Sequence, residues 1–262
     1  MSIPVVVMGG AGRMGSTITR LVREDSSLQL VGRVEHASRL ADLAPLAGCS
    51  DEDTLELVLA KTAQPVIIDF TSPETTLATA RIAAKFGAAQ VIGTTGLTDA
   101  ELAELRDIAC ETRLFWAPNM SVGVTALLKI LPELARLLGE EYDMEMVEIH
   151  HNRKKDSPSG TALRLAQAMV QARDWALRDT ARYCREGIIG ERPHEEIGIQ
   201  TLRGGDVVGV HTAYFLGPGE RIEVTHQAHS RDNFAQGAVR AAKWLADKKP
   251  GALYSMEDVL AL

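Results

Sequence analysis

The chain opens with the stretch Ile3-Pro4-Val5-Val6-Val7-Met8-Gly9-Gly10-Ala11-Gly12-Arg13-Met14-Gly15. Its apolar, largely β-branched start is typical of a buried parallel strand. Behind the glycines, Ile18, Leu21 and Val22 mark the buried stripe of a helix. Strand, glycine turn and helix in this order form a dinucleotide-binding unit, because glycines leave room for a pyrophosphate and the helix N-terminus faces its charge. The sequence therefore predicts cofactor contacts at residues 9–14, although the spacing Gly-x-x-Gly-x-x-Gly differs from the commoner G-x-G-x-x-G.

A second strand is predicted at residues 28–34, and Glu35 and His36 follow it directly. An acidic residue at this place normally accepts hydrogen bonds from the adenosine ribose. Glu35 lies somewhat beyond the usual separation of ~20 residues from the glycine loop, and a longer first helix absorbs the difference. We expect both residues to contact the cofactor; the alternative is a solvated glutamate at a strand end. Residues 37–53 show little periodicity and are predicted to be a loop.

Strands and helices continue to alternate as far as residue 121. Further buried strands are predicted at residues 65–70, 90–92 and 114–117, and Ser72 and the capping box Thr98–Glu101 begin the helices between them. This alternation predicts an α/β fold with a Rossmann-type, doubly wound parallel sheet. Ligands bind at the carboxyl ends of such strands. The residues expected to contact the cofactor there are Phe70, Gly93, Thr94, Thr95, Ala117, Pro118, Asn119 and Met120.

The pattern changes after Val122. A leucine-rich helix is predicted at residues 125–138, and strands at 142–147, 197–202, 207–216 and 222–228, the last two forming a hairpin through Gly217-Pro218-Gly219-Glu220. These elements predict a second α+β domain built on a mixed sheet. We assign residues 122–230 to this second domain. Residues 1–121, completed by a helix within residues 231–262, form the dinucleotide-binding domain.

The most polar part of the second domain is Glu148-Ile149-His150-His151-Asn152-Arg153-Lys154-Lys155-Asp156-Ser157-Pro158-Ser159-Gly160-Thr161-Ala162. It follows a predicted strand and begins a predicted helix, with Ser157 as N-cap and Pro158 in the first turn. Amides at a helix start bind anions, and here they belong to Ser159, Gly160 and Thr161. Imidazoles and cations precede them. Taken alone, a basic loop is usually only solvated, and a Ser-Gly-Thr sequence is usually only a helix cap. Together, the two features predict a site that binds an anion and transfers a proton to it.

Composition excludes several classes of protein. The 262 residues carry Lys+Arg 28 against Asp+Glu 35, a net charge of -7, so we expect neither nucleic acid nor a membrane as partner. Cys49, Cys110 and Cys184 form no C-x-x-C pair, which favours reduced thiols in a cytoplasmic protein. No signal peptide and no membrane-spanning run is recognisable.

Three histidines outside the polar stretch are candidate metal ligands. His211, His226 and His229 alternate with apolar residues on predicted strands and have no accompanying ligand set. We therefore expect them to have structural roles and predict no metal.

The order of three sequence features carries a family resemblance. They are His-His-x-x-Lys-x-Asp-x-Pro-Ser-Gly-Thr at residues 150–161, the N-terminal Gly-x-x-Gly-Arg-Met-Gly, and Ile-Gly-Thr-Thr-Gly at residues 92–96. Together they resemble the 4-hydroxy-tetrahydrodipicolinate reductases (dihydrodipicolinate reductases) of the diaminopimelate and lysine pathway, over essentially the whole chain. The resemblance implies an oxidoreductase that uses NADH or NADPH, a small cyclic dicarboxylate substrate, and a homotetramer built through the second domain's sheet. We expect the runs at residues 207–216 and 222–228 to offer apolar faces for packing between subunits. In that family a hydride reaches C4 of the ring as the hydroxyl leaves as water.

The same resemblance implies roles for individual residues. It puts the general acid/base at His150, a proton-donating or charge-stabilising group at Lys154, and carboxylate contacts at His151 and the amides of Gly160 and Thr161. The chemistry agrees, because the enamine left by a conjugate hydride addition needs a proton, which histidine supplies near neutral pH.

The sequence is compatible with either NADH or NADPH as cofactor and with more than one function. Many relatives carry arginine where this chain has His36, so the group that would meet a 2′-phosphate is Arg33, Arg39 or neither. Two other functions are compatible with the pattern. One is a two-domain NAD(P)-dependent dehydrogenase of another small amino or imino acid, and the other is a nicotinamide-binding regulatory protein without turnover.

Overall fold

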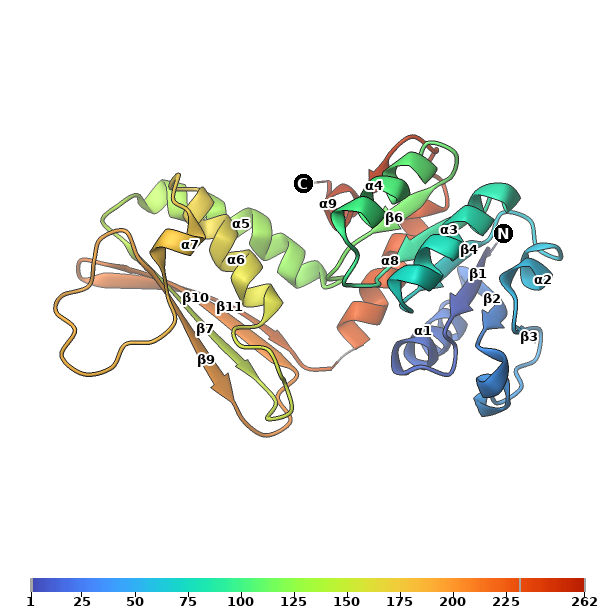
Figure 1. The fold of residues 1–262 in the computed structure, drawn as a ribbon, viewed down its shortest axis with the longest axis horizontal. Coiled ribbons are helices and arrows are strands. Elements are labelled where there is room, and N and C mark those ends of the chain that lie inside the picture. Colours follow the sequence, from blue (N-terminus) through green and yellow to red (C-terminus); the bar gives the residue numbers. More distant parts are fainter. Residues whose placement is uncertain (1, 231, 262) are drawn as a thin grey trace. The chain divides into compact units, whose positions relative to one another are not determined.

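The computed structural model describes residues 2–230 and 232–261, which divide into two compact units (Figure 1). Residues 2–120 and 232–261 form unit 1, and residues 121–230 form unit 2. Residues 1, 231 and 262, at which predicted domain ranges begin or end, lie outside the described residues.

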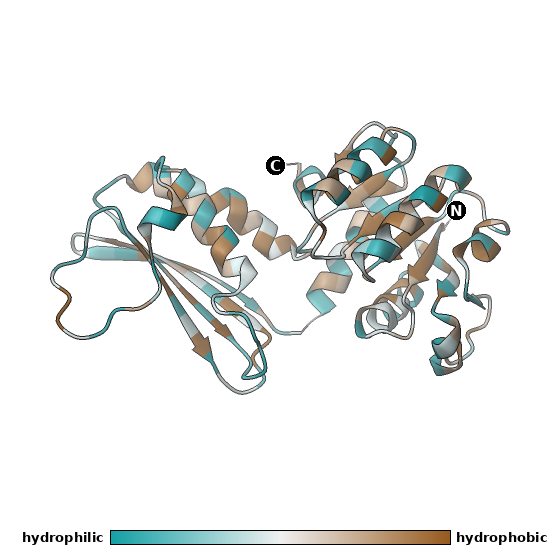
Figure 2. Cartoon of the chain, in the orientation of Figure 1, coloured by the Kyte–Doolittle hydropathy of each residue, from teal (hydrophilic) through white to brown (hydrophobic). Residues whose placement is uncertain are grey.

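Unit 1 is built on a parallel sheet. Its elements in chain order are β1 Ile3–Met8, α1 Arg13–Glu24, β2 Leu28–Val34, the 3₁₀ helix η1 Ala37–Asp42, β3 Ser50–Glu52, α2 Leu55–Leu59, β4 Val66–Asp69, α3 Pro73–Phe86, β5 Ala89–Ile92, α4 Asp99–Ile108, β6 Leu114–Trp116, α8 Asp232–Leu245, β12 Leu253–Tyr254 and α9 Met256–Leu260. Within the described residues the sheet has seven strands, in the order β12-β6-β5-β4-β1-β2-β3, all paired in parallel. The predicted Rossmann-type fold is confirmed, and apart from the short strand β3 its strands are largely hydrophobic (Figure 2).

Local sequence signals account for the starts of two helices of unit 1. Ser72 caps α3 by accepting from the Thr75 amide, with Pro73 in the first turn. Thr98 and Glu101 form both hydrogen bonds of the predicted capping box at α4. The prediction of a loop over residues 37–53 was wrong, because η1 and β3 lie there. β3 is a short polar edge strand that pairs with β2, so apolar periodicity does not reveal it.

Unit 2 combines a mixed sheet with helices. Its elements are α5 Val122–Leu138, β7 Asp143–His150, α6 Gly160–Gln171, α7 Leu177–Thr180, β8 Ala181–Arg182, β9 Ile197–Arg203, β10 Gly209–Gly217 and β11 Glu220–Ala228. The strand order is β11-β10-β7-β9-β8, antiparallel from β11 to β7 and parallel from β7 to β8. The predicted mixed sheet is therefore confirmed, and so is the hairpin, which closes with Gly217 opposite Glu220.

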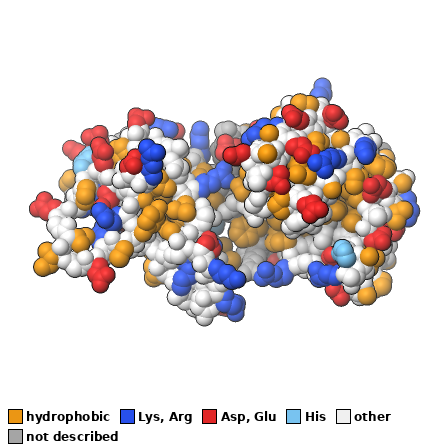
Figure 3. Space-filling model, viewed as in Figure 1, with side chains coloured by type: hydrophobic (Ala, Val, Ile, Leu, Met, Phe, Trp, Pro, Cys, Tyr) orange, Lys and Arg blue, Asp and Glu red, His pale blue; other side chains and the backbone are white. Residues whose placement is uncertain are grey.

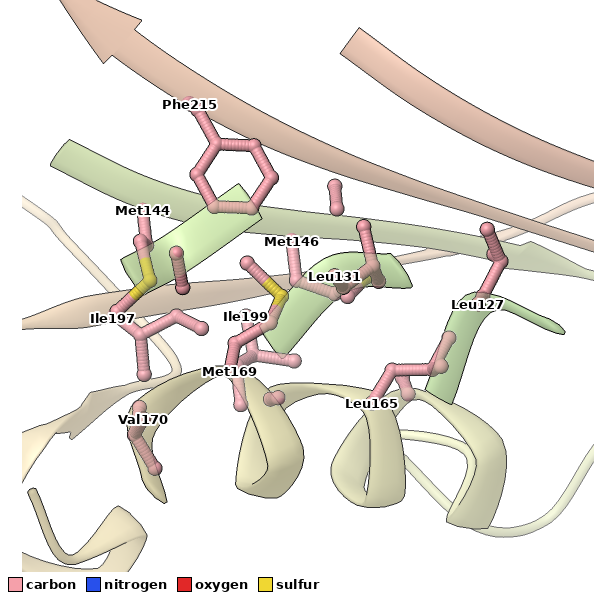
Figure 4. Close-up of a cluster of buried hydrophobic side chains, with 14 residues drawn as sticks. Leu127, Leu131, Met144, Met146, Leu165, Met169, Val170, Ile197, Ile199 and Phe215 are labelled. Atoms are coloured by element: carbon pink, nitrogen blue, oxygen red, sulfur yellow. The ribbon is translucent and has the colours of Figure 1, made fainter. Parts of the chain in front are cut away.

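The core of unit 2 lies between the sheet and helices α5 and α6 (Figure 4). Met144 and Met146 of β7 point into it, together with Phe215 of β10. Because side chains alternate along a strand, Glu148 and His150 continue the same face of β7. The apolar core face thus ends in a polar layer where β7 meets the start of α6.

Two expectations about unit 2 need correction. The N-cap of α6 is Ser159 and not Ser157, since the Ser159 hydroxyl accepts from the Ala162 amide and the helix begins at Gly160. On β11, Ile222 and Val224 do not offer an apolar outer face, because both pack against the core cluster. The residues that alternate with them along the strand, Arg221, Glu223, Thr225 and Gln227, are polar or charged. On the face of the sheet that points away from the core, the apolar side chains belong instead to the strands β7, β9 and β10.

Candidate active site

The polar layer of unit 2 is centred on Glu148, whose side chain is 0% exposed. Its carboxylate accepts hydrogen bonds from both terminal nitrogens of Arg203 at 2.8 Å, and from the Ser159 amide at 2.9 Å. His150 Nδ1 lies 2.6 Å from Oε2, and the Thr201 hydroxyl lies 3.2 Å from Oε1. Burial raises the pKa of Glu148, but the hydrogen bonds from Arg203, His150 and Ser159 outweigh it and hold the pKa at about 2. The group is therefore an ionised carboxylate at neutral pH.

His150 is the last residue of β7 and is 9% exposed. Burial lowers the pKa of its imidazole, and the neighbouring Glu148 carboxylate opposes that shift. The side chain leaves Nε2 beside Gly209 of β10, where an added Cβ would lie 3.0 Å from this nitrogen. Glycine at residue 209 therefore keeps side-chain atoms away from Nε2.

A cross-strand row of polar residues accompanies Glu148. His211 on β10 lies opposite Glu148 in register, and His226 on β11 lies opposite His211. The rings of His150 and His211 are 5.2 Å apart edge to face, and His211 Nε2 lies 3.0 Å from the Ser159 hydroxyl. Burial first, and then the charge of His150, lower the pKa of His211 to about 4. His211 is thus a neutral imidazole packed behind His150.

These partners were not recognised from the sequence. The sequence does contain one indication of the pair. Side chains alternate along a strand, so Glu148 and His150, two residues apart, lie on the same face. Arg203, His211 and Thr201 come from strands far along the chain, so only the sheet register reveals them. Within the described residues, no group of three His, Cys, Asp or Glu side chains is arranged to hold a metal ion.

The loop after β7 carries the remaining candidates. The backbone amide of His151 donates to the Val207 carbonyl at 2.8 Å, which turns the chain out of the strand. Lys154 Nζ pairs with Asp156 Oδ1 at 3.0 Å, and Arg203 donates to the Asp156 carbonyl at 2.8 Å. Figure 3 shows a group of Lys and Arg side chains at the end of unit 2 where this loop lies.

The helix start completes this arrangement. Gly160 and Thr161 form the first turn of α6, directly after the Ser159 N-cap. His150, His151, Lys154 and the helix start thus belong to one continuous strand end, loop and first helical turn. Imidazole, ammonium and helix-start amides are groups that recognise carboxylates.

In unit 1 the glycine turn has the form of a dinucleotide cradle. Gly9 adopts φ +65, and an added Cβ at Gly15 would lie 2.1 Å from the Gly9 carbonyl oxygen, so the helix approaches the turn as only glycine allows. Glu35 Oε2 accepts from the Ala11 amide at 2.9 Å, and Oε1 accepts from the His36 amide at 3.0 Å. The acidic residue therefore lies against the loop that would hold the pyrophosphate, and these residues fit a dinucleotide.

The other predicted cofactor turns lie at the carboxyl ends of the adjacent strands β4, β5 and β6. The Phe70 ring covers Gly93, where an added Cβ would lie 2.1 Å from the ring. Trp116 Nε1 donates to the Thr94 carbonyl at 3.2 Å. Buried Asp69, the last residue of β4, accepts from the amide and hydroxyl of Thr71. Phe70 and Trp116 thus connect the turns after β4 and β6 to the turn after β5.

Exposure differs among the residues of these turns. Thr95 and Pro118 are exposed, and Ala117 donates its amide to the Ile92 carbonyl. The side chains of Thr94 and Met120 are buried. Thr94 and Met120 can therefore offer a ligand little beyond their backbone.

Arg33 and Arg39, the two candidate partners of a 2′-phosphate, differ in burial. Arg33 is buried, paired with Asp51 at 2.7 Å and bonded to the Ala44 carbonyl. Arg39 is exposed and donates to the Ala11 carbonyl at 3.2 Å. Of the two, Arg39 alone lies at the surface beside the glycine loop.

Comparison with known families matches nearly the whole chain. A model described as "Dihydrodipicolinate reductase, N-terminus" matches residues 3–120, and one described as "Dihydrodipicolinate reductase, C-terminus" matches residues 123–260. The chain belongs to the dihydrodipicolinate reductase family. The resemblance drawn from the sequence is thereby confirmed. Membership of this reductase family, with a Rossmann-type unit, implies a pyridine nucleotide cofactor.

Individual members of the dihydrodipicolinate reductase family are close in sequence. The 4-hydroxy-tetrahydrodipicolinate reductase of Nitratidesulfovibrio vulgaris (strain DP4) is 64% identical over 259 residues, 99% of this chain and 100% of the relative. That of Oleidesulfovibrio alaskensis is 63% identical over 260 residues, again 99% of this chain and 100% of the relative.

Solved structures share the fold at lower identity. The dipicolinate-bound dihydrodipicolinate reductase from Paenisporosarcina sp. TG-14 has a TM-score of 0.79 at 23% identity, covering 97% of this chain and 98% of its own. An amine dehydrogenase from Mycobacterium smegmatis has a TM-score of 0.57 at 15% identity, covering 97% of this chain and 95% of its own. In the described part of the chain, no helix has the length and apolar character needed to cross a bilayer.

Proposed function

We propose that this chain reduces 4-hydroxy-tetrahydrodipicolinate with NADH or NADPH, giving tetrahydrodipicolinate and water in the diaminopimelate and lysine pathway. The observation that carries the proposal is full-length identity of 64% to a relative of that name. The arrangement of His150, Lys154 and the start of α6 supports it, because a cyclic dicarboxylate needs cations, helix-start amides and a proton donor.

The roles of the two units follow from their residues. Unit 1 takes the cofactor through residues 9–14, Glu35 and the turns at the carboxyl ends of β4, β5 and β6. Unit 2 takes the substrate through the loop after β7, and it also carries the subunit contacts. The reduced nicotinamide supplies a hydride when bound.

Substrate binding is the first task of the loop after β7. Lys154 exchanges its pairing with Asp156 for a substrate carboxylate, since both partners are carboxylates and Asp156 is exposed. The amides of Gly160 and Thr161, at a helix N-terminus, receive a carboxylate by hydrogen bonding and by the helix dipole. His151 orients the ring from the residue after the strand.

Proton delivery is the task of His150. Loss of the hydroxyl as water leaves a conjugated imine, and hydride addition at C4 turns it into an electron-rich enamine. The imidazolium of His150 then gives its proton to the ring carbon beside C4, and the neutral imidazole is reprotonated from solvent. A general acid of this kind contributes ~10²–10⁴-fold to a rate.

Cofactor choice follows from Glu35 and Arg39. Glu35 accepts the ribose hydroxyls of NADH and repels a 2′-phosphate, whereas Arg39 attracts one. We propose that both cofactors are used and that NADH is at least as good as NADPH.

A coupled assay tests the proposed function. Aspartate semialdehyde and pyruvate are condensed by the preceding synthase, and loss of NADH absorbance is followed after addition of the purified chain. Oxidation that requires the synthase product supports the proposal. NADH binding without oxidation would indicate a regulatory protein, and oxidation with other imino acids alone would indicate a different dehydrogenase.

A further inference from the structure

We infer that Glu148 is the positioning residue for proton transfer: its carboxylate holds the Nδ1–H of His150 and so makes Nε2 the atom that delivers the proton. This inference deepens the proposed function and rests on it for the identity of the proton donor. It assigns a role to a buried carboxylate that the proposed substrate and cofactor contacts do not use.

The assignment of the protonated nitrogen follows from the chemistry of the pair. An ionised carboxylate only accepts hydrogen bonds, so the 2.6 Å contact requires a proton on Nδ1 of His150. Since Nδ1 keeps its proton in both charge states of the ring, the proton that comes and goes is the one on Nε2. The missing side chain of Gly209 leaves space on that side.

The same carboxylate also aligns the anion site with the proton donor. Glu148 Oε1 accepts from the Ser159 amide, one residue before α6 begins. Its partner Arg203 donates to the Asp156 carbonyl, in the loop that carries Lys154. One ion pair therefore fixes the ring of His150, the middle of the loop and the helix start.

Charge balance explains why a buried carboxylate is tolerated close to a proposed dianion site. Arg203 pairs with Glu148 through both terminal nitrogens, so the pair as a whole is neutral. The titratable and charged groups that face His150 are Glu148 on β7, Arg203 on β9, His211 on β10 and Lys154 in the loop. Among these only Glu148 favours the imidazolium, because the others are cationic or a neutral imidazole.

The substitution that tests this role is Glu148→Gln, which keeps the shape and removes the charge. The glutamine amide donates to Nδ1 of His150 and drives the ring proton to Nε2 in the neutral ring. The neutral Nε2–H of that ring is a far weaker acid than the imidazolium. We expect kcat/KM to fall by ~10²–10⁴-fold, with NADH affinity unchanged.

The pH profile separates positioning from mere structural support. Without the carboxylate the imidazolium loses its stabilising partner, so the fall of kcat/KM with rising pH should move to lower pH by about 1–3 units. Thr201→Val is the matched control, because it removes one hydrogen bond to the same carboxylate and leaves the charge. It should keep the wild-type profile.

Nuclear magnetic resonance of labelled histidine reads the tautomer without any turnover. In the wild type at high pH, the unprotonated nitrogen of His150 should be Nε2, and in Glu148→Gln it should be Nδ1. His150→Gln identifies the signal. Because Glu148→Gln leaves Arg203 without its carboxylate partner, Glu148→Gln/Arg203→Met provides a second variant without an unpaired guanidinium beside the buried glutamine. An unchanged tautomer and pH profile in whichever variant folds would overturn the inference, whereas a wild type inactive in the coupled assay would overturn only the proposed function.

Discussion

Glu148 and His150 lie two residues apart on β7 and share a hydrogen bond of 2.6 Å between Oε2 and Nδ1. Neighbours at this spacing point to the same face of a strand, so the pair is built into the secondary structure. The arrangement joins an acceptor that stays ionised to an imidazole whose pKa is lowered by burial. The pH dependence of the reaction should therefore report the protonation of His150.

The first prediction concerns that pH dependence. Burial lowers the pKa of His150, so the free enzyme loses its acid as pH rises through a value below 6.5. In the complex, the substrate carboxylates stabilise the imidazolium and raise its pKa. We expect kcat/KM to decline with rising pH at a lower apparent pKa than kcat does. Steady-state rates from pH 5 to 9 check this, and a kcat/KM that increases over that range would contradict the assignment.

Separate roles are predicted for the two adjacent histidines. His150→Gln should mainly lower kcat, by ~10²–10⁴-fold, because it removes a general acid. His151→Gln should act more through the substrate KM, because it removes binding. Lys154→Ala should impair both. NADH titration is the control. The NADH affinity should be unchanged in the histidine variants, since the cofactor residues belong to unit 1. A near-wild-type kcat in His150→Gln would exclude His150 as the general acid.

Cofactor preference should respond to Arg39. Arg39→Ala should raise the KM for NADPH and leave that for NADH nearly unchanged, because only NADPH carries a 2′-phosphate for the guanidinium to meet. Arg106→Ala, on the exposed side of α4, is the matched control. Parallel kinetics with both cofactors decide the point. A wild type with a large preference for NADPH in kcat/KM would show that Glu35 does not govern this choice.

A methyl group at the glycine turn should weaken cofactor binding. Gly15→Ala places a Cβ 2.1 Å from the Gly9 carbonyl, so backbone must shift in the loop that would hold the pyrophosphate. We expect weaker NADH binding and a loss of stability of about 1–3 kcal/mol, as for an overpacked core. Gly204→Ala meets no atom within 4 Å and is the control. Fluorescence titration and thermal unfolding measure both effects. Wild-type NADH affinity in Gly15→Ala would refute the proposal that the glycine turn binds the pyrophosphate.

Assembly is the fifth prediction. We propose a homotetramer formed through the outer face of the unit 2 sheet, where Leu202 of β9 is 47% exposed. Light scattering of the wild type should give the mass of a tetramer, and Leu202→Lys should reduce it because a charge enters an apolar contact. Leu137→Lys on α5, 80% exposed, is the control and should keep the wild-type mass. A monomeric wild type at assay concentration would count against the proposal.

Features governed by near neighbours were predictable from the sequence alone. The strand, glycine turn and helix at residues 3–24 rest on local periodicity and on the steric freedom of glycine. The capping box at Thr98 depends on side chains and amides within one helical turn. The order His150, His151, Lys154 and the following Ser-Gly-Thr likewise identified the candidate site, because these groups are contiguous.

The tertiary structure alone determined which partners tune those groups. Arg203 and His211 reach Glu148 and Ser159 only because β9 and β10 flank β7 in a particular register, and register is set by packing of the whole sheet face. The same holds for Arg33, which looked available in the sequence and is committed to Asp51 in the fold. Charge, tautomer and accessibility depend on such distant contacts, so they follow from the fold and not from local pattern.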